Sequence, residues 1–244
     1  MKVITYNILS DKWCIYKPDD PSTHKLKNRY EFVLPELLLW ENRLPKIINK
    51  IKDYDIICLQ EVDLVYTSDI IKLLPDHNAY HHIINKTDKT LYKRANPIGN
   101  MTLWKKHIEC TSQRCNSCAL FTTFKMEKEF VLINLHLKGG RDFEAQRISQ
   151  LKSCLKNISV MPVCICGDFN DEFKGELPKL LINFTFYPNV LTCDCYHNNQ
   201  HHYHSFDHVV SKDLTIKQWC EEIEPIPNID NPSDHLPLIF EIQF

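Results

Sequence analysis

The stretch that decides the fold is Val163-Cys164-Ile165-Cys166-Gly167-Asp168-Phe169-Asn170. Its first four residues form an unbroken apolar run, a pattern typical of a strand that is buried on both faces in an α/β protein. We expect the chain to leave the sheet at Gly167 and to present a carboxylate and an amide two residues apart. An aspartate can take a proton from water, while an amide, which does not titrate, can orient that water or a phosphate oxygen.

Two segments combine a helical pattern with a buried strand that follows it. Apolar residues recur at helical spacing over 44–51, and the strand predicted at 55–59 ends at Gln60 and Glu61. A second helical face over 148–158 precedes the strand that exits at Asp168. Further strands are predicted at 2–8, 80–84, 101–104, 119–124, 130–135, 206–210 and 236–242. No repeat and no Pro/Gly/Ser-rich linker divides the sequence, so we expect one α/β domain with stacked sheets over residues 1–244.

The charge balance argues against a protein that binds nucleic acid through a basic surface as a whole. The chain has a formal net charge of −2 and a pI near 6.6. A polyanionic substrate must therefore be bound by local clusters of charge. Candidate basic residues for such clusters are Lys86, Lys89, Lys93, Arg94, Lys105 and Lys106.

The cysteine content and the start of the chain indicate a reducing compartment. The cysteine count of 11 is odd, and the chain opens Met-Lys-Val-Ile-Thr without an apolar leader, so a secreted disulfide framework is not expected. No apolar stretch approaches the roughly 20 residues needed to cross a bilayer. We therefore expect a soluble cytoplasmic protein.

Polar residues that can carry chemistry adjoin several of the predicted strands. Taken singly, each has a structural explanation as a cap or a turn residue. Taken together they indicate a functional site. Because carboxylates outnumber histidines and no cysteine belongs to the set, the favoured cation is a hard one such as Mg²⁺. The set is Asn7, Glu61, His136, Asp168, Asn170, Asp207, Asp234 and His235.

Five short motifs follow one another along the chain: Thr5-Tyr6-Asn7, Leu59-Gln60-Glu61-Val62-Asp63, His136 with Gly139, Gly167-Asp168-Phe169-Asn170, and Ser233-Asp234-His235. In this order they resemble the endonuclease/exonuclease/phosphatase superfamily over nearly the whole chain. The segments 39–43 and 231–238 look similar to its Ccr4/nocturnin/Angel/2′-phosphodiesterase branch. The resemblance implies a four-layer α/β/β/α sandwich, in which two packed mixed β-sheets are flanked by helices.

The resemblance also implies how a metal would be held. Glu61 would bind Mg²⁺, with Mn²⁺ as a substitute. Asn7 would lie close to the metal or the phosphate. Asp234 would complete the metal side of the site.

On the substrate side, the resemblance implies a role for each of the remaining motif residues. His136 would hold the scissile phosphate, and His235 would face that phosphate with support from Asp207. Asp168 would act as the base that activates water, and Asn170 would orient the water molecule.

The loop after His136 departs from the pattern of the deadenylases. Those enzymes supply a tryptophan and a proline there for the terminal adenine, whereas this chain has Leu137-Lys138-Gly139-Gly140-Arg141. Lys138 and Arg141 can bind a phosphate of the substrate, and the two glycines permit a close approach. The adenine-stacking phenylalanine has no clear counterpart before Asp207, and Tyr203 is the nearby aromatic residue that would take its place.

The leading prediction is a Mg²⁺-dependent phosphodiesterase that hydrolyses RNA from the 3′ end. Hydrolysis of 2′–5′ oligoadenylate and removal of a 2′-phosphate from a small nucleotide are alternatives. A catalytically silent adaptor for RNA or protein is a further alternative, although it would need none of these carboxylates. We expect an RNA, oligonucleotide or nucleotide partner, and neither a membrane nor an obligate protein partner.

Two other segments are candidates for metal binding. One candidate is a zinc site at Cys110, Cys115 and Cys118. No second pair of ligands follows at the spacing of a zinc ribbon, so ordinary reduced thiols are favoured. Histidines crowd the segment 197–208, which we interpret as a pH-sensitive, metal-free loop near the active site. They are His197, His201, His202, His204 and His208.

Overall fold

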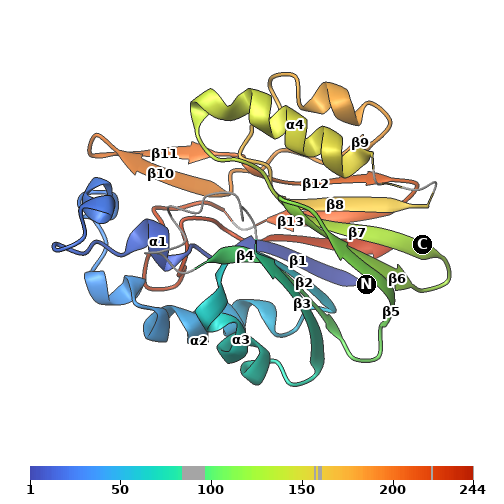
Figure 1. Ribbon diagram of the computed structural model, residues 1–244, viewed down its shortest axis with the longest axis horizontal. Helices are drawn as coiled ribbons and strands as arrows, with labels where there is room; N and C mark the ends of the chain where they lie inside the picture. The colour runs from blue at the N-terminus through green and yellow to red at the C-terminus, as the bar shows by residue number, and fades with distance from the viewer. Residues whose placement is uncertain (84–96, 157, 159–160, 221, 244) are drawn as a thin grey trace.

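The computed structural model describes residues 1–83, 97–156, 158, 161–220 and 222–243, and two six-stranded sheets face each other in it (Figure 1). The first sheet has the order β13-β14-β1-β2-β4-β3. Its strands are β1 (Lys2–Asn7), β2 (Ile56–Asp63), β3 (His77–Ile83), β4 (Ile98–Lys105), β13 (Thr215–Cys220) and β14 (Leu238–Gln243). The second sheet has the order β5-β6-β7-β8-β12-β9. Its strands are β5 (Glu109–Cys115), β6 (Ala119–Lys125), β7 (Glu129–His136), β8 (Val163–Asp168), β9 (Thr185–Phe186) and β12 (Asp207–Lys212).

Helices cover the outer face of each sheet. The α-helices are α1 (Asp11–Cys14), α2 (Trp40–Ile51), α3 (Thr67–Leu73) and α4 (Glu144–Leu155). In Figure 1, α2 and α3 lie under the first sheet and α4 lies over the second. Short 3₁₀ turns occupy Pro21–Leu26, Pro35–Leu38, Leu64–Tyr66, Arg141–Phe143 and Pro178–Leu181. The predicted four-layer α/β/β/α sandwich is confirmed.

Apolar side chains fill all three interfaces between the layers. Between the sheets, Val3 and Phe240 belong to the same buried cluster as Phe130 and Leu132 of the second sheet. Each helix layer packs on its own sheet through a separate cluster, for example Ile47 of α2 with the first sheet. None of the helices among the described residues is long and apolar enough to span a bilayer.

Each sheet contains one parallel pair of strands, and this pairing brings polar strand ends together. β1 pairs with β2, and β7 with β8. Because a parallel pair needs a crossover, α2 and α4 lie between the paired strands in sequence. In the second sheet His136 is in register with Asp168, and the antiparallel β12 begins with Asp207 opposite Asp168. Three predicted site residues therefore lie in one row across β7, β8 and β12.

Several elements differ from the sequence-based expectation. The strand predicted at 80–84 begins earlier, at His77, and Ile84 lies outside the described residues, as do Lys86, Lys89, Lys93 and Arg94. β5, β13 and α3 were not predicted. The prediction of a histidine-rich loop was wrong, since that segment forms a hairpin of β10 (Cys193–His197) and β11 (Gln200–His204) and then enters β12.

Gly167 is the residue of β8 for which only glycine fits. Its φ is +132°, a region that L side chains rarely adopt, and a Cβ there would overlap the carbonyl oxygen of Leu135 on β7. Gly167→Ala is therefore expected to lower the free energy of unfolding by about 2–4 kcal/mol, measured by urea denaturation. Gly175→Ala is the matched control, because its Cβ would meet only the flexible end of Glu144. Equal stability of the two variants would contradict the prediction.

Candidate active site

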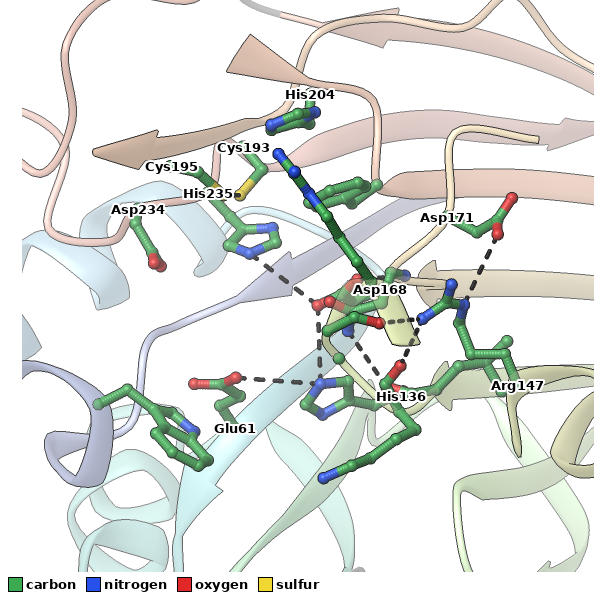
Figure 2. A pocket seen from close by; sticks show the side chains of 18 of the residues that line it. Glu61, His136, Arg147, Asp168, Asp171, Cys193, Cys195, His204, Asp234 and His235 are labelled. Carbon is green, nitrogen blue, oxygen red and sulfur yellow. Dashed lines mark hydrogen bonds and ion pairs between the residues drawn. The ribbon is translucent and has the colours of Figure 1, made fainter. Parts of the chain in front are cut away.

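The polar strand ends of both sheets meet around a pocket of about 980 Å³. Six of the predicted site residues line it, namely Glu61, His136, Asp168, Asn170, Asp234 and His235. Figure 2 shows His136 and His235 on either side of Asp168, with Glu61 beside His136. Asn7 and Asp207 are buried next to these residues and bonded to them. The structure therefore brings together the whole set that the motifs predicted.

Asp168 lies at the centre of this arrangement and is 1% exposed. Its Oδ2 accepts a hydrogen bond from Asn7 Nδ2 at 3.0 Å, and its Oδ1 accepts one from the backbone N–H of Asn170 at 2.7 Å. Nε2 of His136 lies 3.6 Å from Oδ2, and Nε2 of His235 lies 3.9 Å from the same oxygen. The carboxylate is thus held in one orientation, with both imidazoles turned toward it.

Burial raises the pKa of Asp168 to about 6. The charge of Asp207 acts in the same direction, whereas His235, His136 and the N–H of Asn170 oppose it. A carboxylate whose pKa lies closer to neutral is a better proton acceptor than a solvent-exposed one. Asp168 is accordingly suited to act as a general base.

His235 is held by Asp207 in a buried ion pair. Nδ1 of His235 lies 2.6 Å from Oδ2 of Asp207, and both side chains are almost inaccessible to solvent. Burial acts to lower the pKa of His235, but the charge and the hydrogen bond of Asp207 outweigh it, so the pKa lies well above its usual value. His235 therefore presents a positive charge to the pocket at neutral pH.

Glu61 reaches the pocket because β2 is irregular at this point. The sequence predicted that the strand ends at Glu61, but β2 continues to Asp63 through a register shift against β4 between Leu59 and Val62. Glu61 has a φ of +58°, in the left-handed region. A bulge of this kind re-aims a side chain. One oxygen of Glu61, Oε2, accepts the N–H of Ser10 at 3.0 Å, while Oε1 lies 3.9 Å from His136 Nε2.

The loop that carries Ser10 is fixed by a fully buried arginine on α2. The guanidinium of Arg43 donates to the backbone carbonyl oxygens of Ile8 and Leu9 at 2.7 and 2.8 Å. It also donates to Asp11 Oδ1 at 2.7 Å. Arg43 thereby places the Ser10 N–H that orients Glu61. The sequence placed Arg43 in a branch-specific motif without indicating this function.

The donor set around Glu61 fits a hard divalent cation. Among the described residues, no three His, Cys, Asp or Glu side chains gather closely enough to hold an ion by themselves. Mg²⁺ does not require such a cage, since it commonly binds one or two carboxylates and takes its other ligands from water and phosphate. Glu61 Oε1 is available for this role. Asn7 Oδ1 accepts one hydrogen bond, from Leu9 N, and so keeps a second lone pair.

Asp234, predicted on the metal side, has two protein partners that sequence reasoning missed. Its Oδ2 accepts a hydrogen bond from the hydroxyl of Tyr30 at 2.7 Å and one from Nη2 of Arg29 at 3.3 Å. Both partners come from the irregular segment before α2, which has no periodic pattern and no motif. Arg29 also lines the pocket.

The loop after His136, where the sequence departs from the deadenylase pattern, forms one wall of the pocket. Lys138 and Arg141 both line the pocket. A buried arginine that was not predicted, Arg147 of α4, supports the loop by donating to the carbonyl oxygens of Lys138 and Gly140 at 3.1 and 2.7 Å. Asn170 Nδ2 donates to Leu137 O at 3.1 Å, which ties the loop to the end of β8.

The β10–β11 hairpin forms another wall, and here the prediction for Tyr203 needs correction. Tyr203 is not among the residues that line the pocket, whereas His204 and Phe206 are. Neighbouring side chains of a strand point to opposite faces, so Tyr203 and His204 cannot both face the pocket. The rings of His204 and Phe206 stack at 4.7 Å with an interplanar angle of 2°. Phe206, directly before Asp207, is therefore the aromatic residue at this wall.

The cysteines considered for zinc lie in different environments. Cys115 is exposed, whereas Cys118 is buried, with its Sγ 3.6 Å from Sγ of Cys154. A second close pair, Cys193 and Cys195, lines the active-site pocket with an Sγ–Sγ distance of 3.7 Å. Within the part of the chain that the structure describes, Cys110, Cys115 and Cys118 form no cluster that could hold an ion.

Asp207→Asn removes the charge that holds His235 protonated, so the pKa of His235 is expected to fall toward its usual value. The measurement is an NMR titration of the histidine Cε1–H signals. Glu172→Gln is the control, since Glu172 pairs with Nδ1 of His204 at 2.9 Å and should leave the titration of His235 unchanged. An unaltered His235 titration in Asp207→Asn would show that Asp207 does not set this pKa.

Comparison with known proteins identifies relatives of the chain. A family model described as the Endonuclease/Exonuclease/phosphatase family matches residues 4–235. Nocturnin of Mus musculus is 24% identical over 259 residues, a match that covers 86% of this chain and 60% of nocturnin. The chain thus spans about three fifths of the length of the nocturnins that it matches.

Solved structures share the fold at low sequence identity. ANGEL2, described as a 2′,3′-cyclic phosphatase and solved with adenosine-2′,3′-vanadate, has a TM-score of 0.76 and 16% identity, covering 99% of this chain and 94% of that one. The human nocturnin catalytic domain with bound sulfate has a TM-score of 0.71 and 21% identity, covering 100% and 93%. These relatives lie in the predicted branch. The family match over residues 4–235 confirms the resemblance drawn from the motifs: the chain belongs to the Endonuclease/Exonuclease/phosphatase family, whose members hydrolyse phosphodiester or phosphate ester bonds.

Proposed function

We propose that the chain is a Mg²⁺-dependent phosphodiesterase, a single catalytic domain that hydrolyses RNA from the 3′ end. The observation that carries the proposal is the buried row of His136, Asp168 and Asp207, with His235 between the two carboxylates. This arrangement places a base and a cationic imidazole on the same pocket. Both are required when water attacks a phosphate and charge develops on its oxygens.

Asp168 is the group that takes the proton from the attacking water. Its two oxygens are oriented by Asn7 and by the backbone of Asn170, so the carboxylate does not have to reorganise during the reaction. Asn170 has a φ of +51°, a conformation that asparagine tolerates better than most residues. Its side chain lies at the pocket wall, where it can orient the water.

His235 and His136 act on the phosphate itself. His235, kept protonated by Asp207, offsets negative charge on the phosphoryl oxygens. His136 lies between Glu61 and Asp168 and can donate a hydrogen bond to a phosphate oxygen there. Lys138 and Arg141 supply further positive charge along the wall for neighbouring phosphates.

Glu61, with Asn7 beside it, is the proposed holder of Mg²⁺, for which Mn²⁺ would substitute. When bound, the cation supplies positive charge that polarises the phosphate and lowers the barrier to attack. This assignment is supported by two oxygens: Oε1 of Glu61, which is not the oxygen bonded to Ser10 N, and Oδ1 of Asn7, which keeps a lone pair. Metal ligation by Asp234 would have to use the oxygen that Tyr30 and Arg29 leave free.

The wall formed by His204 and Phe206 supports a nucleotide substrate, because stacked aromatic rings offer a surface for a base. Hydrolysis of a 2′-linked ester, in 2′–5′ oligoadenylate or a nucleotide 2′-phosphate, is the second candidate. It is favoured by the likeness to ANGEL2, whose structure holds adenosine-2′,3′-vanadate. A silent adaptor is disfavoured, since it would require none of the buried carboxylates.

Asp168→Asn keeps the shape of the side chain but removes the base, so the hydrolytic rate is expected to fall by more than about 100-fold. The test incubates both proteins with 3′–5′ RNA, 2′–5′ oligoadenylate, single-stranded DNA and NADPH, with and without Mg²⁺. The best substrate decides between the two candidate functions. Near-normal turnover by a folded Asp168→Asn variant would refute the assignment of the base.

The pH dependence follows from the raised pKa of Asp168. Since the base must be ionised, kcat/KM is expected to fall about tenfold per pH unit below pH 6 and to level off above it. The groups that face Asp168 are His136, His235 and Asp207, and the pKa of His235 is raised well above its usual value, mainly by Asp207. Initial rates from pH 4.5 to 8 at constant ionic strength measure the profile. A flat profile across pH 5–7 would exclude Asp168 as the titrating base.

A further inference from the structure

The carboxylate of Asp234 is held within a small cluster on one side of the active-site pocket. Tyr30 and Arg29 both donate to Oδ2 of Asp234, at 2.7 and 3.3 Å. Tyr30 is 6% exposed and Asp234 is 5% exposed. Burial, reinforced by the charge of Asp234, raises the pKa of Tyr30 well above its usual value. The tyrosine hydroxyl therefore keeps its proton and donates a hydrogen bond to Asp234.

Arg29 is the member of this cluster that faces the pocket. Its side chain is 39% exposed, and it lines the pocket together with Glu61 and His235. Its guanidinium packs over the Tyr30 ring, 5.4 Å from the ring centroid. A guanidinium has five N–H donors, and the hydrogen bond to Asp234 uses one of them. Donors thus remain for a ligand in the pocket.

A second arginine of the pocket lining is buried and serves the protein itself. Arg147 donates to the carbonyl oxygens of Lys138 and Gly140 and lies 3.6 Å from Asp171. The ammonium of Lys138 lies 4.9 Å from the centroid of the Phe143 ring. Arg29, in contrast, is bound to Asp234, the residue directly before His235, and it lines the pocket together with Glu61. It is therefore on the side of the pocket where the scissile phosphate is proposed to bind.

We propose that Arg29 contacts a non-bridging oxygen of the scissile phosphate and that Asp234 and Tyr30 are positioning residues that hold its guanidinium in place. The inference rests on the proposed function of this site and assigns it a further catalytic residue. Arginine is suited to the role because its planar fork donates to two phosphate oxygens at once. A guanidinium fixed in this way would add a second positive charge to that of His235 at the phosphate.

The experiment measures binding of 5′-AMP, the product that carries the former scissile phosphate, by calorimetry with and without Mg²⁺. Arg29→Met is expected to raise the Kd of 5′-AMP about 10- to 100-fold, the loss expected for charge-assisted hydrogen bonds. Arg29→Lys should recover part of the affinity, since it keeps the charge but not the fork. Tyr30→Phe should weaken binding by a smaller factor.

Two controls separate a phosphate contact from a structural effect. Arg114→Met removes a guanidinium that packs on Phe121 outside the pocket lining and should leave the Kd unchanged. Adenosine, which lacks the phosphate, should bind Arg29→Met and the wild type alike. Thermal melts establish that each variant is folded.

The outcomes distinguish this inference from the proposed function. If the wild type cleaves RNA but Arg29→Met binds 5′-AMP as tightly as the wild type does, the inference is wrong and the function stands. If the wild type cleaves no substrate but binds 5′-AMP, and Arg29→Met binds 5′-AMP more weakly, the phosphate contact stands and the proposed function is wrong. Absence of 5′-AMP binding by the wild type at millimolar concentration would also overturn the inference.

Discussion

One buried hydrogen bond between the sheets fixes the geometry on which the site depends. Gln60 Nε2 of β2 donates to Asn134 Oδ1 of β7 at 2.8 Å, and both side chains are fully buried. Asn134 Nδ2 donates in turn to the carbonyl oxygens of Leu59 and Met101 in the first sheet. Inside a low-dielectric core such bonds are strong, and their loss leaves unsatisfied groups. Because Glu61 follows Gln60 directly and His136 lies two residues after Asn134, this link sets the separation of the two sides of the pocket.

The buried charges of the site work against the apolar packing around them. Asp168 and Asp207 lie in neighbouring strands of a core whose other residues are mostly apolar, and burial makes their ionised forms unfavourable. The hydrogen bonds from Asn7 and Asn170 and the positive charge of His235 compensate for part of this penalty. The same groups that make the ionised site tolerable to the fold also orient it for the proposed attack on a phosphate, so stability and the proposed reactivity depend on the same few contacts.

What could be predicted from the sequence was local. Apolar runs identified β1, β2, β8 and β14, and the motifs identified the polar strand ends, because both signals are contained in short segments. Arg29 and Tyr30 were missed because only the folded chain brings them to Asp234, more than 200 residues away. The bulge that keeps β2 running past Glu61 has no sequence signal of its own. The hairpin was missed because its strands, Cys-Asp-Cys-Tyr-His and Gln-His-His-Tyr-His, show no regular alternation of apolar and polar residues. Tyr203 was misassigned because the register of β11 was unknown.

The β10–β11 hairpin belongs to neither six-stranded sheet. Its two strands pair with each other, and β10 is joined to the segment that carries the site by an isolated bridge between Cys193 and His235 and by a hydrogen bond from Asp194 N to Asp234 O at 2.9 Å. The row of His136, Asp168 and Asp207 lies instead on β7, β8 and β12. The hairpin therefore lines the pocket without supplying a residue of that row. Substitutions in the hairpin would change the surface offered to a bound base and leave the groups proposed to act on the phosphate in place.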